Sequence, residues 1–386
     1  MTNSGSVQHQ RRYDLDWLRI VAFGLLILYH IGMFYVPWPW HVKSEHAPVD
    51  SLQIPMRLMN SWRLPLLFFV SGVAVRFAID KKPHTSFIAN RFVRLFVPLL
   101  FGMLVVCAPQ TYFELVQSNQ FNGSVWEFYR GYAAMPWASP EGWSMITPTW
   151  NHLWYLLYVL VYTLFLALLS FLSGRRSEQI MDSVISWALQ YSTISLCVVL
   201  PTVFVFMRYI LSSSYDAQQT LWGDWHNLSV SFFIMLLGYA TAKHIRFWAY
   251  IKNGRWFFLA AALLISASIV FNIEKDIFNT PTEAIVRILH CWAVIYTLLG
   301  FGQTLLNNNS AVLRYLTGAI FPYYILHQTL IIVFGVALNG LGLSLPIQMT
   351  LLCVSTLLGC AILYHFVMSK MGKWGILLGT TSASWR

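Results

Sequence analysis

The first apolar stretch of the sequence carries two ionisable side chains that could act together on a substrate. Arg19 and His30 are eleven residues apart, so on an α-helix they fall within roughly 20° of the same face and roughly 16 Å apart along the axis. An imidazole can take up a proton near neutral pH, and a guanidinium can hold an anion. Ionisable groups inside a bilayer must face a polar cavity or a partner. We therefore expect both residues to line one hydrated passage.

Each of these residues also has an ordinary structural interpretation. His30 could pack between helices and bond to a neighbouring carbonyl, and Arg19 could pair with Asp16 one turn earlier and extend to the membrane surface. The depth of His30 in the apolar stretch favours a functional role. For Arg19 alone, the two interpretations are balanced.

The composition shows what kind of element must position these residues. Of 386 residues, 57% are apolar and only 10% are charged, and the mean hydropathy is +0.57. A chain so poor in charge could not cover its own surface in water, which excludes soluble folds and disordered tails. The 25 Lys and Arg residues are dispersed between apolar runs, whereas a nucleic-acid surface needs basic clusters. The pattern predicts a polytopic, all-α integral membrane protein.

Spans of about 20 predominantly apolar residues are needed to cross the hydrocarbon core. By this criterion we expect ten transmembrane helices, near residues 17–37, 62–80, 92–111, 152–173, 187–211, 228–248, 256–273, 285–306, 314–337 and 346–369. Pro201 and Pro322 interrupt two of them, which a helical bundle tolerates. The side that holds both termini carries seventeen Lys and Arg residues and the other side seven. The positive-inside rule therefore predicts that both termini are cytosolic.

We expect residues 1–386 to form a single transmembrane domain, with residues 1–12 as a polar cytosolic leader. The first apolar run contains Arg19 and His30 and lacks a cleavage site, so it is interpreted as a retained span. The five cysteines lie in apolar stretches without metal-ligand spacing, and we expect neither a disulfide framework nor a metal site.

Several motifs follow one another along the chain. They are Leu15-Asp16-Trp-Leu-Arg19 followed by ten residues and His30, Leu67-Phe68-Phe69-Val70-Ser71-Gly72, Arg91-Phe-Val-Arg94-Leu-Phe-Val-Pro98, His152-Leu-Trp154-Tyr-Leu, and Tyr323-Tyr324-Ile-Leu-His327. In these motifs and in their order the chain resembles the membrane acyltransferase 3 family over nearly its whole length. The sequence Trp40-His41-Val-Lys43-Ser44 is also similar to the branch that includes the periplasmic glucan succinyltransferases.

The resemblance implies an O-acyltransferase of the inner (cytoplasmic) membrane. It would move an acyl group from cytosolic acetyl-CoA or succinyl-CoA to a hydroxyl of an extracytoplasmic glycan or related acceptor, with no permanently bound cofactor and no nucleic-acid partner. His30 would be the general base. A transient acyl-imidazole on His30 is an open alternative. The sequence does not identify the residue that orients His30 or the oxyanion donors, although Tyr29, Ser71 and Tyr324 lie in the matching motifs.

The resemblance also suggests which side chains bind the two substrates. The nucleotide end of acyl-CoA would meet arginines near the cytosolic ends of two spans, Arg19, Arg91 and Arg94. Without the resemblance, Arg91 and Arg94 would be interpreted as topological charges. The acceptor would contact His41, His152, Trp154, His327 and Tyr324. For His152, Trp154 and His327, helix packing or interfacial anchoring is an equal alternative.

Other histidines and basic residues carry weaker indications. His290 and His365 match no motif and are interpreted as packing residues. Lys43, Arg57 and Arg63, near the predicted outer opening, would suit an anionic acyl group or acceptor, or could be contacts within the outer loops.

A proton-coupled secondary transporter of a small anionic solute is the main alternative function, because buried histidines and broken helices occur there as well. It predicts internal symmetry, of which the sequence shows no sign. A non-catalytic flippase or scaffold with the same fold is a third possibility.

Overall fold

The computed structural model describes residues 11–81, 83–134, 142–143, 145–211, 219–275 and 277–380, and this part of the chain is helical without strands. Most of the predicted leader therefore lies outside the described residues. The α-helices are α1 Tyr13–Met33, α2 Gln53–Asn60, α3 Arg63–Ile79, α4 His84–Phe101, α5 Ala108–Gln117, α6 Val125–Ala134, α7 Trp154–Ser173, α8 Arg175–Ala188, α9 Ser192–Ile194, α10 Leu200–Leu211, α11 Trp225–Thr241, α12 Ile245–Lys275, α13 Thr280–Leu305, α14 Ala311–Leu338 and α15 Leu345–Ile362.

The predicted all-α membrane fold is confirmed. Nine helical segments of the described chain are long and apolar enough to cross a membrane, and α11, with 17 residues, is only slightly shorter. Five of the nine combine more than one helix. α4 continues through a π-helical turn, Gly102–Val106, into α5, and the predicted span 187–211 is the second half of a broken unit that begins in α8.

The predicted boundary between the sixth and seventh spans is wrong. The apolar pattern placed the end of the sixth span at residue 248, but α11 ends at Thr241 and α12 already begins at Ile245. The indole of Trp248 turns inward and donates to the carbonyl of Ala242, so an apolar residue of the next helix prolongs the hydropathy signal. An ion pair of 2.5 Å between Lys243 and Asp80 fixes this turn beside the end of α3.

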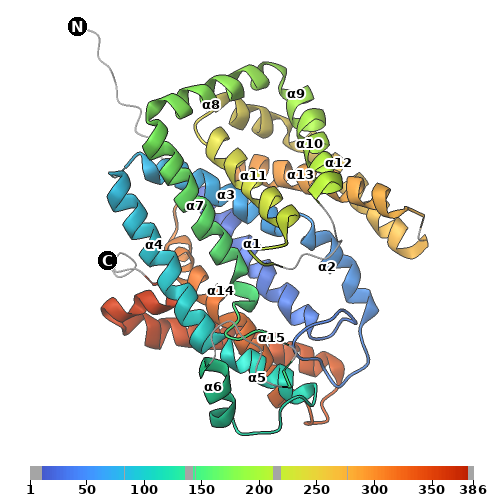
Figure 1. Ribbon diagram of the computed structural model, residues 1–386. Coiled ribbons are helices and arrows are strands. Elements are labelled where there is room, and N and C mark those ends of the chain that lie inside the picture. The colour runs from blue at the N-terminus through green and yellow to red at the C-terminus, as the bar shows by residue number, and fades with distance from the viewer. Residues whose placement is uncertain are drawn as a thin grey trace.

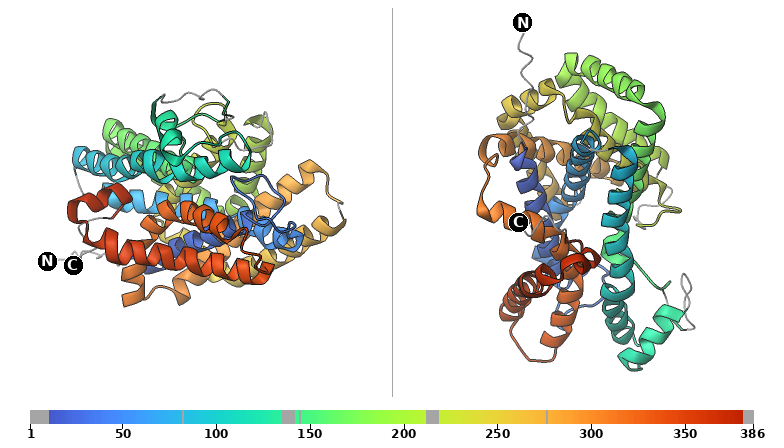
Figure 2. Two further views of the ribbon diagram at one scale, coloured as in Figure 1. Left: turned by 90° about the horizontal axis from the view of Figure 1, so that it is seen from below. Right: turned by 90° about the vertical axis from the view of Figure 1, so that its left-hand side faces the viewer.

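The bundle has two ends, which we call the proximal and the distal face. The proximal face holds the start of α1, where the backbone N–H of Tyr13 donates to Asn307 in the turn after α13. The distal face holds the end of α1, the segment 34–52 and the starts of α3 and α7. In Figure 1, α8 lies at the upper, proximal end and α6 at the lower, distal end, and Figure 2 shows the long helices side by side.

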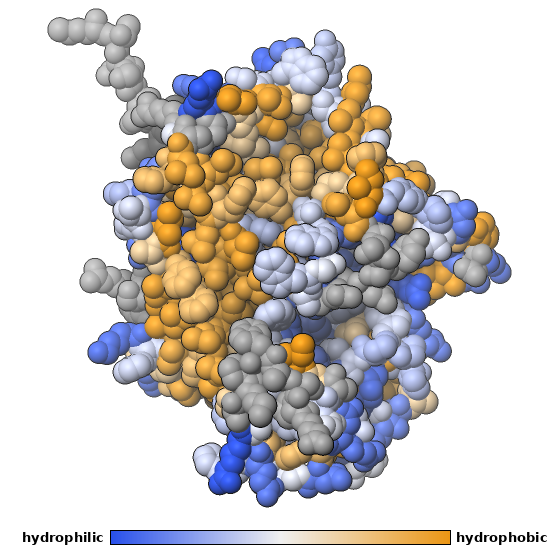
Figure 3. Space-filling view, viewed as in Figure 1, coloured by the Kyte–Doolittle hydropathy of each residue, from blue (hydrophilic) through white to orange (hydrophobic). Residues whose placement is uncertain are grey.

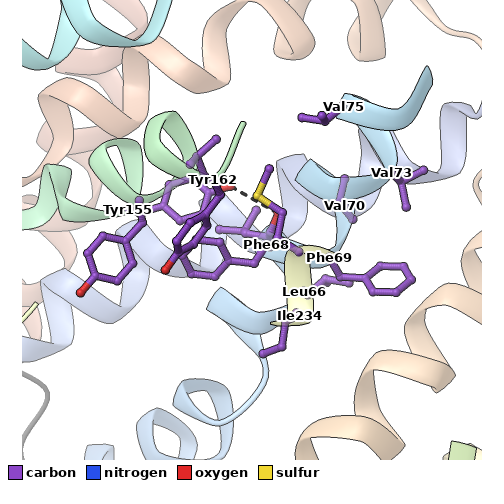
Figure 4. Packing of buried hydrophobic residues seen from close by; sticks show 14 of the residues in the cluster. Leu66, Phe68, Phe69, Val70, Val73, Val75, Tyr155, Tyr162 and Ile234 are labelled. Atoms are coloured by element: carbon purple, nitrogen blue, oxygen red, sulfur yellow. Dashed lines mark hydrogen bonds between the residues drawn. The ribbon is translucent and has the colours of Figure 1, made fainter. Parts of the chain in front are cut away.

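Two glycines allow α3 and α11 to pack backbone against backbone. A Cβ atom on Gly72 would lie 1.9 Å from the carbonyl oxygen of Met235, and one on Gly238 would lie 2.0 Å from that of Phe69. Small residues commonly permit such close approach between membrane helices. On the other side of α3, Phe68 packs between Tyr155 and Tyr162 of α7 (Figure 4). This rigid layer positions one wall of the site described below.

Apolar side chains cover the outside of the bundle. Figure 3 shows them gathered over α4 and α7, where large exposed residues include Phe96, Leu100, Phe165 and Leu172. The same figure shows hydrophilic side chains at the lower end of the view. An apolar belt between polar ends is the surface that a bilayer requires.

The segment after α1 is folded back onto the end of that helix by Lys43. Its ammonium donates to the backbone carbonyls of Met33 at 2.5 Å and Trp38 at 3.0 Å, and also to that of Val36. Burial lowers the pKa of Lys43 to about 8. This side chain caps the helix end, where a cation is favoured, and so it makes the loop contact that was one of its two predicted roles.

Candidate active site

A cavity of about 870 Å³ opens at the distal face and reaches into the bundle between α1, α3, α7 and α14. Side chains from α1, α3, α7 and α14 form its inner wall, and the segments 39–41 and 145–151 form its rim. Of the predicted site residues, the structure places His30, His41, His152, Trp154 and Tyr324 on this cavity. A volume of this size is typical of a small-molecule or cofactor site.

His30 is bonded to a second histidine on the parallel helix α14. Nδ1 of His30 lies 2.7 Å from Nε2 of His327, and the two rings are stacked with centroids 5.0 Å apart. His327 is fully buried behind His30 and is not among the residues that line the cavity. Its other nitrogen, Nδ1, lies 2.7 Å from the backbone carbonyl of Tyr324.

This chain of bonds fixes the tautomers of both neutral rings. A carbonyl oxygen only accepts, so Nδ1 of His327 carries the hydrogen and its Nε2 is an acceptor. Nδ1 of His30 must therefore donate, which leaves the lone pair of His30 on Nε2. Since His30 lines the cavity, the arrangement leaves a basic nitrogen on a ring that its neighbour holds, a geometry also found where a base is oriented by a third group. The residue that orients His30, which the sequence left unidentified, is His327.

His152 belongs to a polar network at the same wall. Its Nε2 donates to the carbonyl of Ile325 at 3.0 Å, and the amide of Gln110 lies 3.4 Å from its Nδ1. The oxygen of Gln110 accepts hydrogens from Asn151 and Gln328. Because both of its nitrogens are occupied in the neutral form, His152 can shape the cavity and support the ring of His327, whose centroid is 5.0 Å away, but it has no lone pair to offer.

The remaining predicted acceptor residues lie around the cavity with different partners. At the rim, Nδ1 of His41 is hydrogen-bonded to the carboxylate of Glu114. The indole of Trp154 packs edge-on against Tyr158, with centroids 5.1 Å apart. The hydroxyl of Tyr324 donates to the backbone carbonyl of His152 at 2.6 Å. Gln110 could not be identified from the sequence, because an amide in an apolar run matches many structural roles.

Arg63 is buried in the bundle, whereas a cation of the outer loops would be exposed. It is the first residue of α3, lines the cavity and is 1% exposed. Its guanidinium lies 4.1 Å from the centroid of the Tyr29 ring. A charge at the edge of a predicted span could have indicated burial, but hydropathy alone assigns such a residue to the interface.

The predicted CoA arginines lie together on the proximal side of the cavity. Arg19 bonds to Asp16 at 3.2 Å, and its buried Nε has no partner among the described residues. Arg19 lies within electrostatic range of Arg91 and Arg94 of α4. The structure therefore brings together three basic side chains from two helices.

The predicted continuous passage from Arg19 to His30 is closed in this structure. The rings of Phe23, Tyr155 and Tyr324 lie between them, with centroids 5.1 to 6.0 Å apart. Tyr155 and Tyr324 form the inner end of the cavity, and neither Phe23 nor Arg19 lines it. The contacts among these three rings bury apolar surface that an open channel would expose to water, which favours the closed arrangement.

Comparisons with known proteins agree with one another. A family profile described as an acyltransferase domain matches residues 12–365. The chain is 26% identical over 344 residues to the glucans biosynthesis protein C of Escherichia coli O139:H28 (strain E24377A / ETEC), a match that covers 85% of this chain and 84% of that protein. The protein of the same name from strain K12 / DH10B is 26% identical over 343 residues, with the same coverage. No solved structure gives a significant match.

Proposed function

Because the chain belongs to the acyltransferase 3 family and is therefore a multi-pass membrane acyltransferase, we propose that it transfers an acetyl or succinyl group from cytosolic acyl-CoA to a hydroxyl of an extracytoplasmic glycan. The observation that carries this proposal is the bonded pair of His30 and His327 on a wide cavity. The name of the relatives supports a glucan as the acceptor.

We assign the proximal face to the cytosol and the distal face to the extracytoplasmic side of the inner membrane. The excess of Lys and Arg in the connections of the proximal side supports this orientation. In this orientation the arginine cluster faces the pool of acyl-CoA, and the cavity faces the glycan.

Arg19, Arg91 and Arg94 are proposed to bind the phosphates of CoA. Guanidinium groups suit phosphate because their planar donors form paired, charge-assisted hydrogen bonds. Among the described residues, the carboxylate bonded to Arg19 is that of Asp16, which Arg11 also contacts at 2.8 Å. The thioester arm would then extend along α1, past the position of Phe23, toward His30.

His30 is proposed to act through Nε2. It takes the proton of the acceptor hydroxyl while the hydroxyl oxygen attacks the thioester carbonyl carbon. The carbon–sulfur bond then breaks, the imidazolium returns the proton to the leaving thiolate, and an ester and free CoA remain. His327 accepts from Nδ1 of His30 throughout, so it keeps the ring in the productive tautomer and stabilises the imidazolium.

The size and lining of the cavity support a sugar acceptor. Trp40, Trp150 and Trp154 all line it, and indole rings stack well on the apolar faces of sugars. Trp40 lies nearly parallel to His30, with ring centroids 6.4 Å apart. A sugar held by these rings would present its hydroxyl groups to Nε2.

The decisive experiment is acyl transfer by the purified full-length protein in lipid nanodiscs, followed by mass analysis of an added glucan. We expect His30→Ala to lower kcat roughly 10³-fold, the usual range for loss of a general base, while acyl-CoA binding is retained. His290→Ala is the matched control, because His290 is also buried but both of its nitrogens bond to serines, Ser61 and Ser266.

Unchanged acylation by His30→Ala would contradict the proposed base. Uptake of a small anion by the wild-type protein without any acylation would instead favour a transporter. The same assay without acceptor separates direct transfer from an acyl-histidine relay, because only the relay leaves a labelled acyl group on His30.

A further inference from the structure

Arg63 is a buried cation without a counter-ion among the described residues. It is 1% exposed, and both Nε and Nη1 are buried without a hydrogen-bond partner. The contact that replaces water is the face of the Tyr29 ring, 4.1 Å from the guanidinium carbon. A stacked ring stabilises a cation only modestly, and a buried charge with unused donors is costly unless an anion completes it.

The backbone around Arg63 adds to this positive potential. Arg63 is the first residue of α3, a helix of 17 residues whose N-terminus has no side-chain cap. Helix N-termini carry a partial positive charge and favour anions, so a cation is unfavourable there. The buried guanidinium and the helix end thus favour the same missing group, an anion.

The position of Arg63 places that anion next to the reacting atoms. Arg63 and His30 line the same cavity, and Arg63 lies within electrostatic range of both His30 and His327. No Asp or Glu is among the described residues that line the cavity. The described part of the chain therefore offers no carboxylate to Arg63 here, which favours an anion that comes from a ligand.

We propose that Arg63 is a specificity-determining residue that binds an anionic group, a carboxylate or phosphate, carried by one of the two substrates in the cavity. This inference rests on the proposed acyl transfer at His30 and adds to it a requirement for charge on the substrate. The group is carried either on the acyl chain of the donor or on the sugar acceptor.

A ground-state anion explains the structure better than a transient one. The tetrahedral oxyanion of acyl transfer exists only during the reaction and would leave Arg63 unpaired in every bound complex. It is also a single oxygen, whereas a guanidinium has five donors arranged to meet two oxygens at once. A carboxylate or phosphate uses that arrangement and neutralises the site as soon as the substrate binds.

The test compares charged and neutral substrates with full-length Arg63→Gln in nanodiscs. Succinyl-CoA and acetyl-CoA form the donor pair, and a phosphate-bearing and an unsubstituted oligosaccharide form the acceptor pair. We expect the ratio of kcat/KM for the charged over the neutral member to fall ~100-fold in one pair, since sites built for a polar group discriminate strongly. A fall in the donor pair places the anion on the acyl chain, and a fall in the acceptor pair places it on the sugar.

Arg57→Gln is the matched control, because it removes the same charge from α2 at a residue that does not line the cavity. Both ratios should stay within about twofold of the wild type. Arg63→Lys keeps the charge but loses the planar donors, so we expect an intermediate ratio. An equal loss for charged and neutral substrates in Arg63→Gln would overturn the proposal, because it would indicate a role in folding or at the oxyanion common to all substrates.

A binding measurement separates this inference from the proposed function. Succinate and inorganic phosphate should each be tested for protection of the wild-type protein against thermal unfolding, with succinamide as the neutral control. We expect at least one anion to protect the wild type and not Arg63→Gln. Absence of protection, or equal protection of both proteins, would overturn the anion site. Protection that depends on Arg63, in a wild-type protein that transfers no acyl group, would refute the proposed function and keep the site.

Discussion

The two ends of α3 bury the same kind of side chain in opposite ways. At the proximal end, Arg76 is 3% exposed, forms a 2.5 Å ion pair with Glu178 of α8 and contacts the hydroxyl of Tyr239 at 3.4 Å. At the distal end, Arg63 is buried at least as deeply, and its Nε and Nη1 have no hydrogen-bond partner in the described part of the chain. One helix therefore carries both a completed and an uncompleted buried charge.

This difference distinguishes structural polar groups from those proposed to act on a ligand. Two proximal ion pairs are complete, Lys243 with Asp80 and Arg76 with Glu178, so they hold helices together. The distal polar groups surround a cavity and keep unused donors and a free lone pair. We therefore expect substitutions at the proximal pairs to change stability, and substitutions around the cavity to change the rate of transfer.

The largest effect that would sharpen this contrast is expected at His327. His327→Ala removes the acceptor for Nδ1 of His30 and frees the ring to adopt the wrong tautomer, so we predict a loss of roughly 10²-fold in kcat. We expect the melting temperature to change only slightly although kcat falls. His365→Ala, an exposed histidine of the same side-chain type, is the control and should retain full activity. A drop in stability without a specific loss of rate would show that His327 only packs.

Arg76→Ala should show the reverse pattern. It leaves Glu178 without its partner, but that carboxylate is 23% exposed, so hydration offsets part of the loss. We predict a decrease of about 2 kcal/mol in the free energy of unfolding, below the range for a fully buried pair. The rate per folded molecule should be unchanged. The double variant Arg76→Ala with Glu178→Gln should recover part of the stability, and additive losses would contradict a direct pair.

Substitution of the proximal arginines Arg91 and Arg94 tests whether the charges on that side are purely structural. Arg91→Ala with Arg94→Ala should raise KM for acyl-CoA roughly tenfold, with a smaller effect at high salt because the proposed contacts are electrostatic. Arg246→Ala with Lys252→Ala removes two exposed cations near the start of α12 and serves as the control. An unchanged KM would return Arg91 and Arg94 to the topological interpretation.

Much of the fold could be predicted because hydropathy and length determine membrane helices almost independently of their neighbours. The α11 to α12 boundary was missed since Trp248 is apolar but turns back to cap the preceding turn. The place of His30 on a cavity was predictable, because an ionisable side chain deep in an apolar span must face a polar cavity or a partner. The pairing with His327 depends on how α1 and α14 lie in parallel, which the spacing within either helix does not encode.

Arg63 shows the same limit of prediction from the sequence. Its place at the start of α3 was evident, yet its burial depends on the rings and loops that close over it, including Tyr29 of α1. Sequence patterns describe one helix at a time, so they identify the residue type and miss whether its charge is completed. Only the packed structure separates Arg63 from Arg76.

The smallest predicted effect concerns the boundary between the two regions. Phe23, Tyr155 and Tyr324 lie together at the inner end of the cavity. In the proposed mechanism they separate when the thioester arm reaches His30 from the proximal side. The three rings also exclude water from the inner end of the cavity, which would protect a reactive acyl group from hydrolysis. Phe23→Leu thins this barrier while losing less packing than Phe23→Ala would.

We therefore predict that Phe23→Leu raises hydrolysis of acyl-CoA in the absence of acceptor by about threefold, with a smaller change in transfer when the glucan is saturating. The measurement is release of free CoA thiol with and without glucan. Leu28→Ala, on an exposed side chain of the same helix, should leave the ratio of hydrolysis to transfer unchanged. If Phe23→Leu also leaves it unchanged, the three rings are packing alone, and the acyl group must reach His30 by a path that does not cross them.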